Sequence, residues 1–394
     1  MVAVLDLEEA VIIEPAFEPS PGLAVTATQT KPRGLLERLD EGVVLGDGGY
    51  LLELERRGWV QAGPFTPEVS ITHPEALLEL HREFARAGAE ILQALTFYAS
   101  EEKLATVGLA GEVPAINRAA VRIAKRVADE VAAGDPAAGF AEFVAGEEES
   151  EEGVQKVLRE GARGKRRERP LVAGGLSLTW AYDPSDMSSG YHVRELFLRQ
   201  LEVQAAEGVD LVIAETFGWL NEALIAIKAA KEFGLPVVAT MAFDKVPRSY
   251  ESIDAGICAL ALLDAGADVI GVNCLRDPSM SLPLIAEMKA AAPNARLACQ
   301  PVAYRTSYDS PNFSARPEFP FALESIALTR GEMEAYARAA KEMGVSLIGS
   351  CCGSVAIHVA AMAKALGKPS FVERDWRSSG RAMSAYEKHG HLKD

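Results

Sequence analysis

The sequence predicts an α/β protein with the (β/α)8 TIM barrel fold. Eight short apolar runs, rich in Val, Ile and Leu, are each followed by a segment with the apolar period of a helix. The runs do not alternate strictly between apolar and polar residues, which is typical of parallel strands buried on both faces. No linker divides the eight units, and 394 residues are enough for one barrel with insertions.

An open, doubly wound sheet is the alternative arrangement of alternating strands and helices. Such a sheet would need a phosphate-binding G-x-G-x-x-G motif after its first strand. The first apolar run ends instead in the residues GDGGY, at 46–50. The barrel is therefore the favoured arrangement.

The expected strands and helices follow one another in chain order. The strands are expected at residues 43–50, 91–99, 170–177, 210–217, 236–243, 268–274, 296–304 and 345–353. The helices are expected at residues 73–88, 117–133, 191–208, 220–234, 252–267, 281–293, 329–344 and 354–368. The first of these helices has a proline in its first turn and a glycine at its end, the usual asymmetry of helix ends.

Three segments do not fit this repeat. Residues 1–33 show no sustained helical period, so we expect an N-terminal extension before a barrel of residues 34–368. Residues 135–169 contain an acidic run and then a basic run, which predicts a charged, solvated insertion between the second helix and the third strand. Residues 369–394 are expected to form a short C-terminal tail.

The charge balance argues against nucleic acid as a partner. The chain has 40 basic and 56 acidic residues, a formal net charge of −16, whereas phosphate binding needs clustered Lys and Arg. No apolar run approaches ~18 residues, so no membrane span is expected. The N-terminus carries an acidic pair where a signal peptide needs a basic start. We therefore expect a cytoplasmic protein whose five cysteines are thiols or metal ligands.

Three of the five cysteines end two of the predicted strands. Cys274 ends the sixth strand, and Cys351 and Cys352 end the eighth. The active site of a barrel lies at the C-terminal ends of its strands, so these thiols should meet at one mouth. Zn²⁺ favours sulfur ligands, and three thiolates leave a fourth position open. The alternative is that all three are buried core thiols, the role we expect for Cys258 and Cys299.

An open zinc site with three thiolates predicts transfer of a group to a thiol substrate. A thiol bound to zinc loses its proton near neutral pH and becomes a nucleophile. Hydrolysis is less favoured, because three anionic thiolates quench the Lewis acidity that a water-activating site needs.

The polar residues at other strand ends suit an amino acid thiol. Gly48 and Gly49 would let backbone N–H groups approach a carboxylate closely. Asp47 and Glu215 could pair with an ammonium group. For Asp47 the alternative is a turn residue within the D-G-G sequence.

Aromatic residues are also expected at the mouth. Phe65, Phe97, Tyr98 and Trp219 could gather there. Aromatic faces attract cations, and quaternary ammonium ions are bound in such cages. Ordinary packing is the alternative for each ring.

These motifs resemble the zinc-dependent homocysteine S-methyltransferases, and in particular their betaine-type branch. The matching stretches run from about residue 34 to 368, without the insertion, and comprise GLLERLDEG, GDGGY, RGWVQAGPFTPE, HPEALLELHREFARAGAEILQALTFYASEEKL, GVNC, DPSMSL, QPVAY, EFPF and GSCCG. The resemblance implies a (β/α)8 barrel with zinc on Cys274, Cys351 and Cys352. It also implies that a methyl group passes from glycine betaine to homocysteine, giving methionine and dimethylglycine.

The resemblance implies two sets of substrate contacts. Homocysteine would bind near Gly48 and Gly49, with Asp47 and Glu215 as the catalytic carboxylates that fix its amino acid end. The methyl donor would bind in a pocket that includes Phe65, Phe97 and Tyr98.

Some positions depart from the betaine enzymes. Thr216 stands where they carry a tyrosine that can occupy the open position of zinc, and Phe65 where they carry a tryptophan. The tail is shorter than their oligomer-building arm, although its EKHG sequence places His389 where the family has a donor-contacting histidine. The insertion at 135–169 is not a family feature either.

Several expectations follow from these departures. Thr216 and His389 are counted as substrate-binding residues, and a homo-oligomer is kept as an expectation. A sulfonium donor, such as S-methylmethionine or dimethylsulfoniopropionate, stays open as an alternative to betaine. A non-catalytic barrel that binds zinc or a thiol also stays open.

Overall fold

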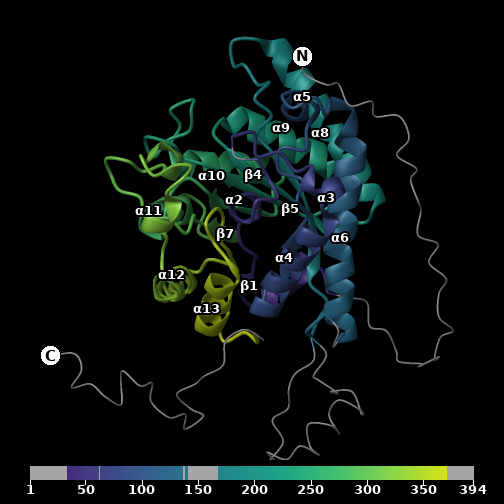
Figure 1. The fold of residues 1–394 in the computed structure, drawn as a ribbon. Coiled ribbons are helices and arrows are strands. Elements are labelled where there is room, and N and C mark those ends of the chain that lie inside the picture. Colours follow the sequence, from purple (N-terminus) through teal and green to yellow (C-terminus); the bar gives the residue numbers. More distant parts are fainter. Residues whose placement is uncertain (1–32, 62, 136–137, 141–166, 371–394) are drawn as a thin grey trace, which may run out of the picture. The chain divides into compact units, whose positions relative to one another are not determined.

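The structure is a computed structural model that describes residues 33–61, 63–135, 138–140 and 167–370. Figure 1 shows the strands of this part of the chain enclosed by helices. The predicted N-terminal extension (except Arg33), most of the predicted insertion, and the tail from residue 371 on, which contains His389, lie outside the described residues.

Eight parallel strands form one sheet in the described part of the chain. They are β1 (Val44–Leu45), β2 (Ile91–Gln93), β3 (Leu171–Ser177), β4 (Leu211–Phe217), β5 (Val237–Met241), β6 (Val269–Asn273), β7 (Leu297–Gln300) and β8 (Leu347–Ile348). Their hydrogen-bonded order is β1-β8-β7-β6-β5-β4-β3-β2. Each predicted run contains one strand, and sequential neighbours around a single sheet confirm the barrel and exclude the doubly wound alternative.

The seam between β1 and β2 closes the barrel with few bonds. The Glu90 N–H donates to the carbonyl of Leu45, 2.8 Å away. The Leu45 N–H donates to the Glu90 carboxylate, also at 2.8 Å. Further along, the Gln93 N–H donates to the Asp47 carboxylate at 2.7 Å. Two carboxylates therefore hold a seam where regular strand pairing is missing.

The helices surround the strands, and eight of them match the predicted ones. These are α4 (Pro74–Ala87), α6 (Val113–Ala133), α8 (Met187–Ala206), α9 (Leu220–Lys231), α10 (Ala255–Asp264), α11 (Pro278–Ala291), α12 (Arg330–Glu342) and α13 (Ala356–Leu366). Short helices α2 (Leu51–Arg56), α3 (Val69–Thr72) and α5 (Glu101–Ala105) lie in the loops after β1 and β2. No helix in these described ranges is both long and apolar enough to cross a membrane.

Helix α1 (Leu35–Glu41) precedes the first strand and closes one end of the barrel. Its Leu35 and Leu39 are buried against strand residues that point into the barrel, such as Val44, Ile91 and Leu347. These three lie near the N-terminal ends of their strands. The C-terminal ends, where the predicted site residues lie, therefore form the open end of the barrel.

Candidate metal centre and active site

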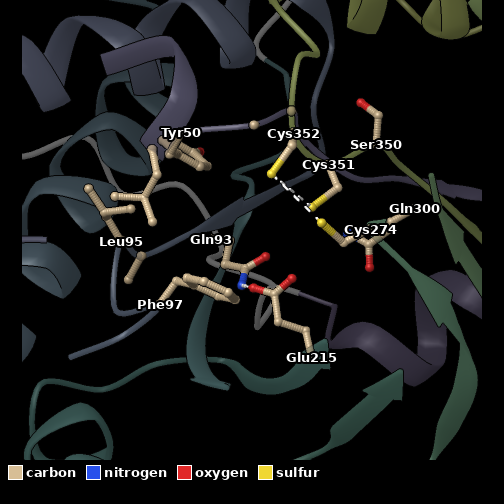
Figure 2. A pocket seen from close by; sticks show the side chains of 14 residues that line it. Tyr50, Gln93, Leu95, Phe97, Glu215, Cys274, Gln300, Ser350, Cys351 and Cys352 are labelled. Carbon is tan, nitrogen blue, oxygen red and sulfur yellow. Dashed lines mark hydrogen bonds between the residues drawn. The ribbon is translucent and has the colours of Figure 1, made fainter. Parts of the chain in front are cut away.

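Three sulfur atoms meet at the open end of the barrel, as the sequence predicts (Figure 2). The Cys274 Sγ lies 3.7 Å from the Cys352 Sγ, which lies 4.0 Å from the Cys351 Sγ. All three sulfurs lie within 4.8 Å of one another. Tetrahedral zinc with Zn–S bonds of about 2.3 Å places its sulfurs roughly 3.8 Å apart. The separations therefore fit zinc.

The end of β7 positions both cysteine segments. The Cys274 N–H donates to the carbonyl of Gln300 at 2.9 Å, and the Cys351 N–H donates to that of Pro301 at 2.8 Å. Cys274 leaves β6 with a positive φ of 55°. A Cβ at Gly353 would lie 2.5 Å from the ring of Tyr304, so only glycine fits the turn after the cysteine pair.

The three thiols are coupled electrostatically. Hydrogen bonds from Cys351 and Cys352 lower the pKa of Cys274 well below its usual value. The bonds to Cys274 in turn raise the pKa of Cys351 and of Cys352. Sulfurs at this separation repel one another when all are thiolates, so the cluster favours a bound divalent cation.

The other two cysteines lie away from this cluster. Cys299 is buried on β7, where burial raises the pKa of its thiol to about 12. Cys258 is buried within α10, and burial raises the pKa of its thiol to about 12 as well. Both positions agree with core roles.

A pocket opens beside the sulfurs. It is lined by residues from the C-terminal parts of six strands and from the segments after them, namely Gly48, Gly49, Tyr50, Leu51, Gln93, Ala94, Leu95, Phe97, Glu215, Cys274, Gln300, Ser350, Cys351 and Cys352. It brings together most of the residues that the sequence predicts for the site. Gln93, Gln300 and Tyr50 are additions that the sequence reasoning missed.

Asp47 precedes Gly48, is buried, and is not among the residues that line this pocket. Its carboxylate accepts the Tyr50 hydroxyl at 2.6 Å and the Gln93 N–H at 2.7 Å. Burial raises the pKa of Asp47 to about 7, and the Gln93 and Tyr50 hydrogen bonds oppose that shift. The carboxylate is thus held in one orientation and titrates near neutrality.

Tyr50 connects Asp47 to a buried histidine of α4. The Tyr50 hydroxyl lies 2.9 Å from the Nδ1 of His81. Because the single hydroxyl proton goes to Asp47, His81 Nδ1 is the donor in that contact. Burial lowers the pKa of His81 to about 3, so its imidazole is neutral. The chain His81–Tyr50–Asp47 was not predicted, although the histidine lies on the inward face of the first predicted helix.

Glu215 lies near the C-terminal end of β4 and is held by two amide side chains. Gln93 donates to one carboxylate oxygen, and the Asn273 Nδ2 donates to the other at 2.9 Å. Asn273 also joins Thr216, because its Nδ2 donates to the Thr216 hydroxyl at 2.7 Å and its Oδ1 accepts the Thr216 N–H at 2.8 Å. Burial, aided by the charge of Cys351, raises the pKa of Glu215.

The two glycines after β1 are explained by close packing. A Cβ at Gly49 would lie 2.7 Å from the carbonyl oxygen of Cys351, and one at Gly48 would lie 2.5 Å from the ring of Phe84. The Gly49 N–H already donates to the carbonyl of Ser354 at 3.2 Å. Of the two backbone N–H groups expected to face a carboxylate, the one on Gly49 is therefore used within the protein.

The predicted aromatic residues fall into separate groups. The rings of Phe97 and Tyr98 contact each other, with centroids 4.2 Å apart. Phe65 contacts Phe319, with centroids 6.3 Å apart, in a cluster that also touches the cysteine segments. Trp219 packs against Tyr250 instead, with centroids 5.3 Å apart.

Comparison with known proteins places this geometry in context. The profile of a family described as "Homocysteine S-methyltransferase" matches residues 44–366. "Betaine--homocysteine S-methyltransferase 1" of Mus musculus is 40% identical over 380 residues, which cover 93% of this chain and 81% of the mouse protein. The Danio rerio protein of the same name is 40% identical over 366 residues, covering 91% and 79%.

A solved structure shares the fold. The metallated form of the homocysteine methyltransferase MmuM from Escherichia coli aligns with a TM-score of 0.61 at 18% identity. The alignment covers 83% of this chain and 97% of that protein. At this identity the likeness concerns the barrel alone.

Proposed function

The chain belongs to the homocysteine S-methyltransferase family, and from this premise we propose that it methylates the thiol of homocysteine to give methionine. The methyl donor is a cationic onium compound, with glycine betaine favoured by the 40% identity to betaine enzymes. One observation carries the proposal: a cluster of three sulfurs lines the same pocket as Glu215 and Phe97. The sulfurs would hold the metal that binds the substrate thiol, Glu215 would pair with its ammonium group, and the Phe97 ring would face the cationic donor.

Zinc is the proposed cofactor, and Cys274, Cys351 and Cys352 would hold it. When bound, it supplies the positive charge that keeps a substrate thiol deprotonated near neutral pH. We also propose a cytoplasmic location, because all five cysteines are free thiols and a reducing compartment preserves them.

The carboxylates Asp47 and Glu215 would bind the ammonium group of homocysteine. Their orientations are set before substrate arrives, since Gln93 donates to both. A preorganised carboxylate pair loses little conformational freedom on binding, which favours alignment of the sulfur with the donor. The substrate carboxylate would approach the N–H of Gly48, because that of Gly49 is already engaged.

Phe97, Tyr98 and Phe65 would receive the cationic donor. The substrate sulfur forms a bond to the methyl carbon while the bond from that carbon to nitrogen breaks, and nitrogen keeps the electron pair. Dimethylglycine leaves as a neutral amine that needs no proton, so no general acid is required. Thr216 and His389 stay proposed substrate contacts.

A sulfonium donor is the second candidate. The side chain of Thr216 is engaged by Asn273 and is too short to replace the tyrosine of the betaine enzymes. With sulfonium donors the chemistry is the same, except that a neutral sulfide leaves.

The test is methionine formation by zinc-loaded protein with homocysteine and one donor at a time. Glycine betaine should give methionine and dimethylglycine in equal amounts. Turnover with S-methylmethionine or dimethylsulfoniopropionate but not betaine would move the assignment to a sulfonium donor. Bound zinc and homocysteine without turnover by any donor would replace the proposal by a non-catalytic barrel.

A further inference from the structure

We propose that Lys103 selects methyl donors that carry a carboxylate, by binding that carboxylate at the outer side of the donor pocket. The inference rests on the proposed methyl transfer and names the donor class of the same site. Zwitterions such as glycine betaine would be accepted, and simple cations such as choline would be rejected.

Lys103 is held by aromatic faces at the mouth of the barrel. Its Nζ lies 4.3 Å from the ring centroid of Tyr98 and 5.4 Å from that of Trp180. Both distances are within the range in which a ring attracts a cation. Trp180 comes from the loop after β3 and is 67% exposed, and Lys103 is itself half-buried, so the ammonium group lies near the protein surface.

The charge of Lys103 is not neutralised by a neighbour. The two acids beside it on α5 pair with residues of α8: Glu101 contacts Arg199, and the Glu102 carboxylate lies 2.8 Å from His192 Nε2. Among the described residues, Lys103 has no carboxylate or carbonyl partner. An ammonium group has three N–H donors, and aromatic rings do not satisfy them as an anion would.

Tyr98 links this ammonium group to the sulfur cluster. Its ring contacts that of Phe97, with centroids 4.2 Å apart. The adjacent ring of Phe97 lines the pocket beside the sulfurs. One aromatic wall therefore extends from the sulfurs to Lys103.

The charges along this wall fit a zwitterion only when its cationic end points towards the sulfurs. The cationic methyl end is attracted to the sulfurs and aromatic faces, and the carboxylate end to Lys103. A simple cation in the same pocket would be repelled by the ammonium group without a compensating ion pair. The result is selection by charge at the end of the donor that does not react.

The experiment measures donor binding and turnover in parallel. Dissociation constants of glycine betaine and choline are measured by calorimetry on the zinc-loaded protein without homocysteine, so that no methyl transfer occurs, and KM and kcat are measured with betaine as donor. Lys103→Met removes the charge but keeps an unbranched side chain, and Lys103→Arg keeps the charge. Lys103→Gln is a second neutral variant, and Lys341→Met on the exposed side of α12 is the matched control.

We expect Lys103→Met and Lys103→Gln to raise the Kd and KM of betaine by about tenfold or more, the value of one charge-assisted hydrogen bond. The Kd of choline should stay equal or fall. The KM of homocysteine and the kcat should change by less than about threefold, and Lys103→Arg should restore betaine affinity. Lys341→Met should match the unmodified protein.

Two failures are distinguishable. Unchanged betaine and choline affinities in both neutral variants would overturn the role of Lys103, whether or not methionine is formed. If no donor gives methionine, the proposed function is wrong. If the neutral variants nevertheless lose the preference for betaine over choline in binding, the role of Lys103 is still supported.

Discussion

At the scale of single residues, Asp47 accepts two hydrogen bonds with one carboxylate oxygen. Its carboxylate accepts the Gln93 N–H across the seam between β1 and β2 and also accepts the Tyr50 hydroxyl. Neutral His81 behind Tyr50 leaves the tyrosine proton directed at Asp47. The arrangement favours the ionised carboxylate against the cost of burial, which is what binding of an ammonium group needs.

The affinity for methionine should rise with pH. Asp47 has a pKa of about 7, so its protonated form predominates below that pH and its carboxylate above. Only the carboxylate attracts the ammonium group, so Kd should fall roughly tenfold between about pH 6 and pH 8. Calorimetry with methionine measures this without a titrating substrate thiol.

The control for this pH dependence is Asp47→Asn. An asparagine can still accept the Gln93 N–H, so the seam should be kept, and the affinity should be weak at every pH. An equal slope in the variant would assign the titration to another group, with Glu215 the first candidate.

At the scale of elements, the loop after β1 is fitted to the loop after β8. Gly49 lies against the backbone of Cys351 and Cys352, with 2.7 Å from its missing Cβ to the Cys351 carbonyl oxygen. Substitution there must displace the segment that carries two of the proposed zinc ligands. The glycine pair is thus explained by packing before any ligand is considered.

Gly49→Ala should lower the free energy of unfolding by about 1–3 kcal/mol, the usual cost of overpacking, and should weaken zinc binding. Denaturant titration and competition with a zinc chelator measure the two effects. Gly111→Ala is the matched control, because a Cβ at that position would meet no atom within 4 Å. Equal stability and zinc affinity of the two variants would contradict this account.

The sequence predicts elements better than it predicts contacts between them. The sequence predicts one strand over residues 91–99, but β2 ends at Gln93, and Tyr98 within the same run has a positive φ of 62°, which a strand residue does not adopt. The three cysteines could be predicted to meet, since the ends of parallel strands converge. The contact of Lys103 with Trp180 could not, because it depends on how two loops 77 residues apart direct their side chains.

At the scale of the whole molecule, the sulfur cluster joins distant parts of the barrel. Cys274 follows β6, Cys351 and Cys352 follow β8, and the end of β7 is bonded to both segments. An ion on these sulfurs would connect segments separated by 78 residues of chain. Zinc binding should therefore stabilise the folded barrel in addition to binding the substrate thiol.

Removing zinc with a chelator should lower Tm by several degrees, and adding zinc should restore it. Zinc at about 100 times its Kd stabilises the folded state by about 2.7 kcal/mol. Cys274→Ser should lose zinc and activity together, and its Tm should not respond to the chelator. Metal analysis and thermal melts measure these outcomes.

Cys258→Ser is the control for that substitution, because its thiol lies within α10 and contacts the Ile253 carbonyl. It should keep zinc and activity. An active Cys274→Ser protein without zinc would remove the cysteine from the proposed site.

The seam between β1 and β2 has a consequence for motion. Asp47 contributes both to closure of the barrel and to the proposed substrate site, so the two equilibria are linked, and linkage is reciprocal. A substrate that prefers the closed seam must make opening of the seam rarer by the same factor. Opening of this seam should therefore be most frequent in the protein without bound substrate.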